Sequence, residues 1–436
     1  MKFWNEKKLR NDSRCFCHFL QTFQENALSL QCFSKKTLEE SVLFMINTFF
    51  SILPLTISIG WLVAFTARYR KIYYAQRLLV LFFFLCSILY VAHAVYFNYQ
   101  YSLFARIEAV YAFCTLAGYP LYYLYISNLT DEKPSAWHNF LVLLPSAILS
   151  VVAMFLYVLM DEETRCCFVI HEFYTHEPHG HDLSWVVKAQ IYRVYVMKVL
   201  YVLQVIPACY FGYKKLKRFD EQIRNFYTDT DEKTLWPVRV LLVTLLIFAC
   251  VSVTANFLGR EFFIKEWWMI CIPSILFSIL LFSVGFVGYR QRFTAADYYK
   301  ELREADERER QKGQGNKVKM NDDTKELLKA QIFDLMENQE IFRQQNFSLS
   351  DFVVRLGSNR SYVSNYINNE LHLSFSDFIN QYRVSHAQIL MKDYGNSLTL
   401  SEIWKQSGFS SESSFYRIFK RMVGITPLAW KKQCKK

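Results

Sequence analysis

Seven long apolar stretches fill most of the first two-thirds of the chain and limit what it can fold into. They run over roughly 41–67, 78–99, 101–127, 138–160, 186–212, 237–258 and 266–289. A helix needs about 20 apolar residues to cross the hydrocarbon core of a bilayer. Soluble proteins seldom place so many long apolar helices in series, so the pattern predicts a polytopic membrane domain. The third stretch is the weakest, because Arg106 and Glu108 interrupt it.

Composition divides the chain into an apolar part and a charged part. Charged residues are sparse between Ser41 and Gly288 and dense afterwards. The 436 residues are 52% hydrophobic, yet the mean hydropathy is only +0.07, as expected for two contrasting parts. The net charge of +11 suits an anionic membrane surface or nucleic acid. Lys and Arg outnumber Asp and Glu after Ser397, which favours nucleic acid for the C-terminal part.

We therefore predict an all-α chain of four segments. These are a polar N-terminal tail, a seven-span membrane domain, a charged linker and a DNA-binding domain, over 1–40, 41–289, 290–322 and 323–436. The linker is free of Gly and Pro as far as Lys312, which predicts a solvated helix continuing the seventh span. A coiled coil that pairs two copies of the chain is the alternative, although no sustained apolar heptad is visible.

Lys and Arg in the short loops predict the orientation of the spans, because basic residues favour the cytoplasmic side. They gather after the first and fifth spans, at Arg68, Arg70, Lys71, Arg77, Lys214, Lys215, Lys217, Arg218, Arg224 and Lys233. This pattern predicts a multi-pass protein of the cell (inner) membrane with a cytoplasmic C-terminus and an outer N-terminus. The basic N-terminal tail disagrees. Either translation starts later, the tail crosses despite its charge, or the first stretch does not span.

Explicit helix start and stop signals follow Asp322. A Ser or Thr stands three residues before an acidic residue at Ser348–Asp351, Ser374–Asp377 and Thr399–Glu402, the spacing of a capping box. Gly357 and Gly408 stand where a helix must end and the chain must turn. These signals predict two helix-turn-helix units, with helices over 349–356 and 359–369, then 400–407 and 411–423, joined by a helix over 375–392.

The last helix of the second unit separates into two faces. Phe415, Ile418, Phe419 and Met422 recur at helical spacing and should pack inward. The other face is polar and carries Glu412, Ser413, Tyr416, Arg417 and Arg421. A recognition helix needs such an apolar back and a front able to contact bases and phosphates. A solvated amphipathic helix is the simpler interpretation, but two tandem units make it the weaker one.

Residues from about 325 to 433 resemble the DNA-binding domain of the AraC/XylS family of bacterial transcription regulators. The resemblance is carried by Asn359-Arg360-Ser361-Tyr362-Val363-Ser364, Ile367-Asn368, Tyr382-Arg383-Val384, Ala387, Leu390, Ile403, Gly408-Phe409, Ser414-Phe415, Arg417, Phe419-Lys420, Gly424 and Thr426-Pro427. The sequence departs from the family at Trp404, where Ala is usual, and at Trp430-Lys431, where an aromatic residue followed by Arg is usual.

The resemblance implies that the two units read adjacent segments of the DNA major groove. By position it implies base-facing residues at Ser361, Ser364, Asn365, Glu412, Ser413 and Arg417. Further candidates for DNA contact are Asn359, Arg360, Lys420 and Arg421. Promoter DNA and RNA polymerase are then the expected partners beside the lipid bilayer. The family says nothing about the signal that a membrane domain would receive.

Two groups of residues are candidates for sensing that signal. Ionisable residues are rare in membrane spans and usually face a partner or cavity, which singles out His93, Glu108, Arg193 and Lys198. Snorkelling to the interface is the alternative. A predicted outer loop holds His171, His176, His179 and His181, weak candidates for a metal or pH sensor. A solvated His-rich loop is the favoured interpretation there.

The sequence contains no nucleophile elbow, P-loop, dinucleotide fingerprint or HExxH motif, so we predict neither an enzyme nor a cofactor. The leading hypothesis is a membrane-bound, sequence-specific transcription regulator. The alternative is a transporter or channel with a DNA-binding appendage. Such a protein should show repeats or broken spans, and the sequence shows no paired repeat.

Overall fold

The computed structural model is an all-helical protein over the residues that it describes. These residues are 45–46, 48–71, 73–132, 135–175, 183–230, 233, 235–258, 267–291, 293–311, 322–394 and 397–434. A single antiparallel bridge, between Tyr227 and Ser348, is the β-type pairing recorded among them. The tail over 1–40 and the predicted histidines His176, His179 and His181 lie outside the described residues.

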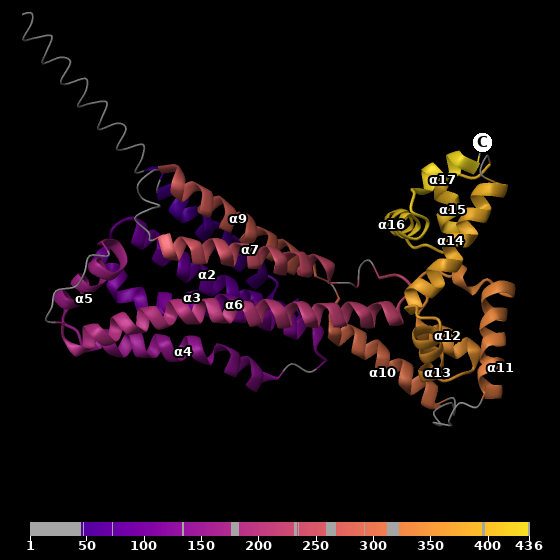
Figure 1. Ribbon diagram of the computed structural model, residues 1–436, viewed down its shortest axis with the longest axis horizontal. Helices are drawn as coiled ribbons and strands as arrows, with labels where there is room; N and C mark the ends of the chain where they lie inside the picture. Colours follow the sequence, from indigo (N-terminus) through magenta and orange to yellow (C-terminus); the bar gives the residue numbers. More distant parts are fainter. Residues whose placement is uncertain are drawn as a thin grey trace, which may run out of the picture.

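Seven helices are long and apolar enough to cross a membrane, as the hydropathy pattern predicts. They are Thr48–Thr66, α2 (Tyr74–Phe97), α3 (Tyr101–Thr130), α4 (Ala136–Val158), α6 (Trp185–Phe226), α7 (Trp236–Leu258) and α9 (Trp267–Arg290). The third stretch is a continuous helix despite Arg106 and Glu108. A short helix α5 (Glu162–Val169) and a π-helical turn (Ile170–Thr175) follow α4 at one end of the bundle (Figure 1).

Helix α3 lies at the centre of the bundle, packed against α2, α4 and α6. In its most apolar segment 67% of residues are buried, against 22% in α4, so α4 lies on the periphery. Large apolar side chains such as Val158, Ile206 and Leu203 are exposed on the outer surface. A helix that is apolar on its exposed face needs an apolar solvent, which is what a bilayer supplies.

Two helices extend from the bundle toward the C-terminal domain (Figure 1). Helix α6 continues past its apolar part to Phe226, and its last turns bury Leu216, Phe219, Ile223 and Phe226 at helical spacing. The sequence predicts a loop after residue 212, because a hydropathy scan does not detect an amphipathic helix. Helix α10 (Ala295–Gln311) follows α9 as a charged helix. It begins where the Asp297 carboxylate accepts hydrogen bonds from the Thr294 N–H and hydroxyl, both at 2.9 Å.

The C-terminal domain contains the helices that the start and stop signals predict. In order they are α11 (Asp322–Phe333), α12 (Leu349–Leu356), α13 (Arg360–Asn365), α14 (Phe375–Asp393), α15 (Leu400–Gln406), α16 (Glu412–Val423) and α17 (Pro427–Cys434). The predicted helix over 359–369 is in fact α13 followed by a π-helical turn, Tyr366–Glu370. Helix α14 joins the two helix-turn-helix units, as expected.

Candidate nucleic-acid interface

Local hydrogen bonds fix where the first helix of each helix-turn-helix unit begins. In the first unit the Ser348 hydroxyl accepts from the Asp351 N–H (3.2 Å) and the Asp351 carboxylate accepts from the Ser348 N–H (3.0 Å). The pair Thr399 and Glu402 repeats this reciprocal cap in the second unit. The hydrogen bonds from Thr399 to the Glu402 carboxylate lower the pKa of that carboxyl group. Each cap satisfies N–H groups that a helix start would otherwise leave without a partner.

Glycine is required at the turn of the second unit. Gly408 has φ +83°, a left-handed conformation that glycine adopts without steric conflict. A Cβ atom on Gly408 would lie 2.5 Å from the carbonyl oxygen of Phe342, so the turn also needs the missing side chain. Gly357 plays the conformational part in the first unit, at φ +61°. These two positions are the ones that the sequence indicates.

The apolar faces of both units are buried as predicted. Phe415, Ile418 and Phe419 of α16 form one core with Ile403 and Phe409, and Met422 is partly buried against it. In the first unit Phe352, Val353, Val363 and Ile367 are buried within the larger core. Trp404 and Trp430, the departures from the family pattern, pack against the core of the second unit and not on the polar face of α16.

The polar face of α16 is open. Glu412, Ser413, Arg417, Lys420 and Arg421 are exposed on this short helix. The hydroxyl of Ser411 caps it by accepting from the Ser414 N–H at 3.2 Å. Arg421 also donates to the Asp377 carboxylate of α14 at 2.5 Å, which ties the two helices together on this side. The face therefore presents a carboxylate (Glu412) and a hydroxyl group (Ser413) near its N-terminus and three cationic side chains along its length.

The corresponding face of α13 lies against other parts of the chain. Asn359 caps α13 by accepting from the Ser361 N–H at 2.8 Å. Arg360 and Ser364 are half-buried, whereas Ser361 and Asn365 are exposed at the edge of a groove. The opposite wall of that groove belongs to α6 and α10 and includes Gln222, Asn225, Tyr298 and Leu302. Arg360 Nη1 lies 2.7 Å from Asp306 Oδ1 of α10.

Comparison with known protein families identifies the type of domain that these helices form. The model of a helix-turn-helix domain, HTH_18, matches residues 353–433, which span most of the first unit and all of the second. Residues 353–433 are an AraC-type helix-turn-helix domain. Similar curated proteins include uncharacterized HTH-type transcriptional regulators of Staphylococcus aureus strains MSSA476 and COL, each 33% identical over 88 residues. The alignment covers 20% of this chain and 12% of each relative. No solved structure gives a significant match.

A short loop after α6 holds the AraC-type domain at three points. The Thr228 hydroxyl and N–H donate to the carbonyl of Phe347 at 2.7 and 3.2 Å, just before α12. The Ser376 hydroxyl of α14 donates to the carbonyl of Thr228 at 3.0 Å. Ser410, in the turn of the second unit, donates to the Asp229 carboxylate. One loop of the membrane half thus contacts both units and the helix between them.

Arg383 of α14 ties this helix to the segment that precedes α12. Its Nε and Nη2 groups donate to the carbonyls of Phe342 and Gln344, both at 2.7 Å, and the side chain is buried. Burial lowers the pKa of this guanidinium to about 10, so it stays charged at neutral pH. The family resemblance includes Arg383, and the structure gives it a packing position on α14 rather than one on a reading face.

The four intramembrane candidates for sensing do not share one site. Glu108 and Arg193 form a buried ion pair between α3 and α6, with Arg193 Nη2 at 3.0 and 2.9 Å from the two carboxylate oxygens. Lys198 is half-buried and lies 5.6 Å from the ring centre of Tyr195. His93 alone of the four lines a cavity within the bundle.

The histidine loop is described only in part. His171 lies in the π-helical turn Ile170–Thr175 and is partly buried. Within the described ranges, no cluster of His, Cys, Asp and Glu side chains has the grouping that a metal ion needs.

Sequence reasoning did not single out Thr228, Asp229 or Asp306. Each is a short polar residue in a charged stretch, and such residues are usually solvated. The one signal that points to this region is the amphipathic pattern of the last turns of α6, whose buried face must pack against something.

Proposed function

We propose that this chain is a membrane-bound, sequence-specific DNA-binding transcription regulator. The membrane domain over 41–289 would receive a signal, and the helical linker over 290–322 would pass it to the DNA-binding domain over 323–436. The observation that carries the proposal is the contact between the first reading helix and two helices that extend from the bundle. Arg360 pairs with Asp306 of α10, and the groove beside α13 is walled by α6.

The contact supports a resting state in which only one unit can read DNA. A recognition helix must enter the major groove, and its base-contacting side chains must reach the base edges. Helices α6 and α10 form the opposite wall of the groove that Arg360, Ser364 and Asn365 line, so a duplex and these helices compete for one face. The polar face of α16 is exposed and lies apart from α10 (Figure 1). Full promoter binding then requires α13 to separate from α6 and α10.

In the second unit, residue chemistry suggests separate roles. Arg417 is placed to read a base, because Arg contacts the two acceptors of guanine bidentately. Lys420 and Arg421 suit phosphate contacts, which add affinity without sequence preference. Glu412 and Ser413, at the start of α16, suit contacts with base edges or with a neighbouring phosphate. RNA polymerase would then be recruited or blocked by the bound regulator.

A cytoplasmic C-terminus agrees with the charge distribution. The end of α6 that extends from the bundle carries Lys214, Lys215, Lys217 and Arg218, and basic residues favour the cytoplasmic side. The transporter alternative draws less support. Transport sites usually form where membrane helices are broken, whereas Pro120, Pro145, Pro207 and Pro273 all lie inside helices.

Mapping of bound DNA tests the proposal. Chromatin from cells with and without the chain would be crosslinked, the membrane fraction isolated and the attached DNA sequenced. We expect a small set of promoters that share a two-part sequence motif, one part for each unit. Recovery of DNA without any shared motif would overturn the proposal.

Reporter fusions test the orientation. A reporter that is active only in the cytoplasm should work after Lys436 and fail within the loop over 171–181. Activity in that loop would invert the membrane topology.

A further inference from the structure

A cavity of about 240 Å³ lies inside the membrane bundle, between the Thr48–Thr66 helix and α2, α3, α6, α7 and α9. An apolar cavity of about 150 Å³ in a protein core is large enough to bind benzene. The space in this bundle is therefore sufficient for a substituted aromatic ring.

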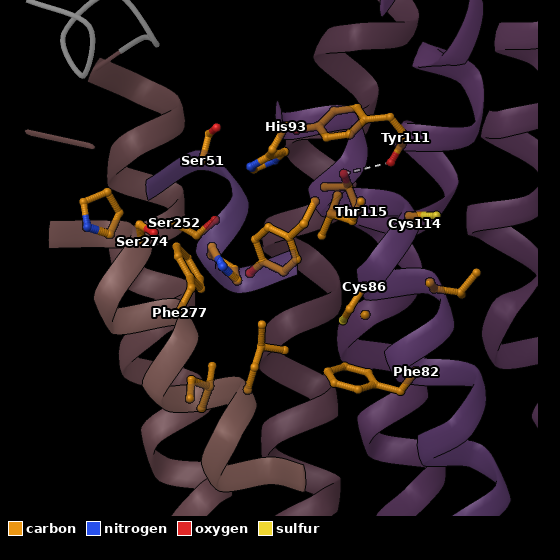
Figure 2. A pocket seen from close by; sticks show the side chains of 18 of the residues that line it. Ser51, Phe82, Cys86, His93, Tyr111, Cys114, Thr115, Ser252, Ser274 and Phe277 are labelled. Atoms are coloured by element: carbon orange, nitrogen blue, oxygen red, sulfur yellow. Dashed lines mark hydrogen bonds between the residues drawn. The ribbon is translucent and has the colours of Figure 1, made fainter. Parts of the chain in front are cut away.

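The two ends of the cavity differ in chemistry. Figure 2 shows Ser51, His93, Thr115, Ser252 and Ser274 toward one end and Phe82 with Cys86 toward the other. Aromatic rings from α2, α3, α6 and α9 line much of the wall, and such rings pack favourably against another ring. The cavity therefore suits a molecule with an apolar ring and a polar group at one edge.

No Asp, Glu, Lys or Arg is among the described residues that line the cavity. An unpaired charge in a site without a counter-ion is strongly disfavoured. Glu108 and Arg193, which are buried in the bundle, form an ion pair with each other and are not part of the lining. The described part of the lining thus offers no Lys or Arg side chain to an anion and no Asp or Glu side chain to a cation, which favours an uncharged ligand.

The hydroxyl groups at the polar end define the kind of hydrogen bond on offer. Thr115 donates to the carbonyl of Tyr111 at 2.9 Å, Ser51 to that of Thr48 at 2.9 Å and Ser274 to that of Phe50 at 2.5 Å. A hydroxyl has one hydrogen to donate and two lone pairs to accept with. All three have used their hydrogen on the backbone, so toward the cavity they can act as acceptors. A ligand that hydrogen-bonds to these three hydroxyls must bring a donor.

We propose that this cavity is a binding site for a small, uncharged aromatic molecule that carries an O–H or N–H donor, of the phenol or indole class. The donor contacts the hydroxyl oxygen of Thr115, and the ring lies among the aromatic side chains. Such a molecule partitions into lipid and reaches the site through the bilayer. A charged signal molecule does not fit this site.

The proposal extends the proposed function, because the cavity is built from the helices that hold the DNA-binding domain. Tyr201 belongs to α6, which ends at the loop that contacts both units, and Phe277 belongs to α9, which leads into α10. A ligand changes a conformational equilibrium only by binding one state better than the other. Filling the cavity alters the packing of α6 and α9 and so favours one position of α13 over the other.

Binding is tested on the full chain in lipid nanodiscs without DNA, by calorimetric titration with phenol and with indole. Toluene serves as the ring without a donor and benzoate as the charged ring. We expect saturable binding of at least one donor probe, weaker binding of toluene and none of benzoate. Toluene binding as tightly as both donor probes, benzoate binding, or no binding of either donor probe would overturn the proposal.

A matched pair of variants locates the site. Thr115→Val keeps the shape and removes the acceptor, so we expect affinity for the donor probe to fall about 2- to 10-fold, the range of one hydrogen bond. Thr254→Val on α7 removes a hydroxyl that likewise donates to its own helix, to the Cys250 carbonyl at 2.9 Å, but it lies outside the cavity. It should leave affinity unchanged. Equal affinities for the two variants would overturn the placement.

Promoter occupancy is measured separately, with and without the probe that binds. A change in occupancy that Thr115→Val reduces is the expected result. Probe binding without any change in occupancy would overturn the coupling of this cavity to DNA binding. Absence of probe binding, with promoter binding intact, would overturn the ligand site and leave the proposed function standing.

Discussion

Arg360, at the start of the first reading helix, forms an ion pair with Asp306 of α10 at 2.7 Å. The two side chains are 25% and 40% exposed, so water screens the pair. Ion pairs of this kind contribute about 0–1 kcal/mol. The contact is therefore weak enough for a DNA phosphate to replace it, since a phosphate offers Arg the same bidentate geometry as a carboxylate. A weak pair at this position suits a regulator that must change state.

Asp306→Asn should increase promoter binding in the absence of any signal. Loss of the ion pair removes up to about 1 kcal/mol from the docked state, which allows a rise of up to about 5-fold in apparent affinity. The measurement is fluorescence anisotropy of labelled promoter DNA with the full chain in nanodiscs. Glu304→Gln is the matched control, because Glu304 pairs with Arg308 within α10 itself. Equal effects of the two variants would count against α10 as the element that restrains α13.

Thr228→Val should loosen the contact between the loop after α6 and the DNA-binding domain. The Thr228 hydroxyl is buried and donates to the Phe347 carbonyl, and the loss of such a bond costs about 0.5–1.5 kcal/mol. We expect faster amide hydrogen exchange at Thr228 and around Phe347, measured by mass spectrometry. Thr130→Val serves as control, since its buried hydroxyl donates to Ile126 within α3. Unchanged exchange at Phe347 would mean that this hydrogen bond does not hold the two halves together.

Arg417→Ala and Lys420→Ala should affect DNA binding in different ways. Arg417→Ala should cost about 1–3 kcal/mol at the preferred sequence and relax the preference at one base pair. Lys420→Ala should weaken binding to all sequences alike and reduce the slope of log affinity against log salt by about 1. Selection of bound sequences from a random pool, repeated at several salt concentrations, separates the two effects. If Arg417→Ala still selected the full motif, a residue other than Arg417 would have to be the one that contacts this base pair.

Gly408→Ala should destabilise the second unit more than Gly424→Ala. Both glycines have left-handed backbones, at φ +83° and +88°, so both substitutions carry a conformational cost of about 1–2 kcal/mol. Only at Gly408 does the new Cβ collide with backbone, whereas at Gly424 no atom lies within 4 Å. Hydrogen exchange of α16 in the full chain should therefore rise more for Gly408→Ala. Equal protection in the two variants would show that the turn can shift without cost.

The elements that the sequence predicts well are those with local signals. Capping boxes and turn glycines mark α12 and α15, and hydropathy marks the seven long helices. The relations between distant segments had no such signal. Thr228 and Phe347 are 119 positions apart, and nothing in either neighbourhood indicates the partner. Likewise, Glu108 and Arg193 stand out as costly residues in spans, but only the packing of α3 on α6 reveals that each is the partner of the other.

The Glu108–Arg193 pair should prove to be a structural element rather than a ligand contact. Both side chains are almost fully buried, so removal of one charge leaves the other unpaired in an apolar setting, at a cost of about 3–5 kcal/mol. Glu108→Gln alone should therefore lower the amount of folded chain in the membrane fraction. The double variant Glu108→Leu with Arg193→Met replaces the pair by apolar side chains and should recover that amount, because buried pairs are often exchanged at little cost. Abundance is measured by immunoblot of membranes and the regulatory response by a promoter reporter. The expected result is recovered abundance with a normal reporter response. Recovered abundance with a lost response would show that Glu108 and Arg193 take part in sensing the signal.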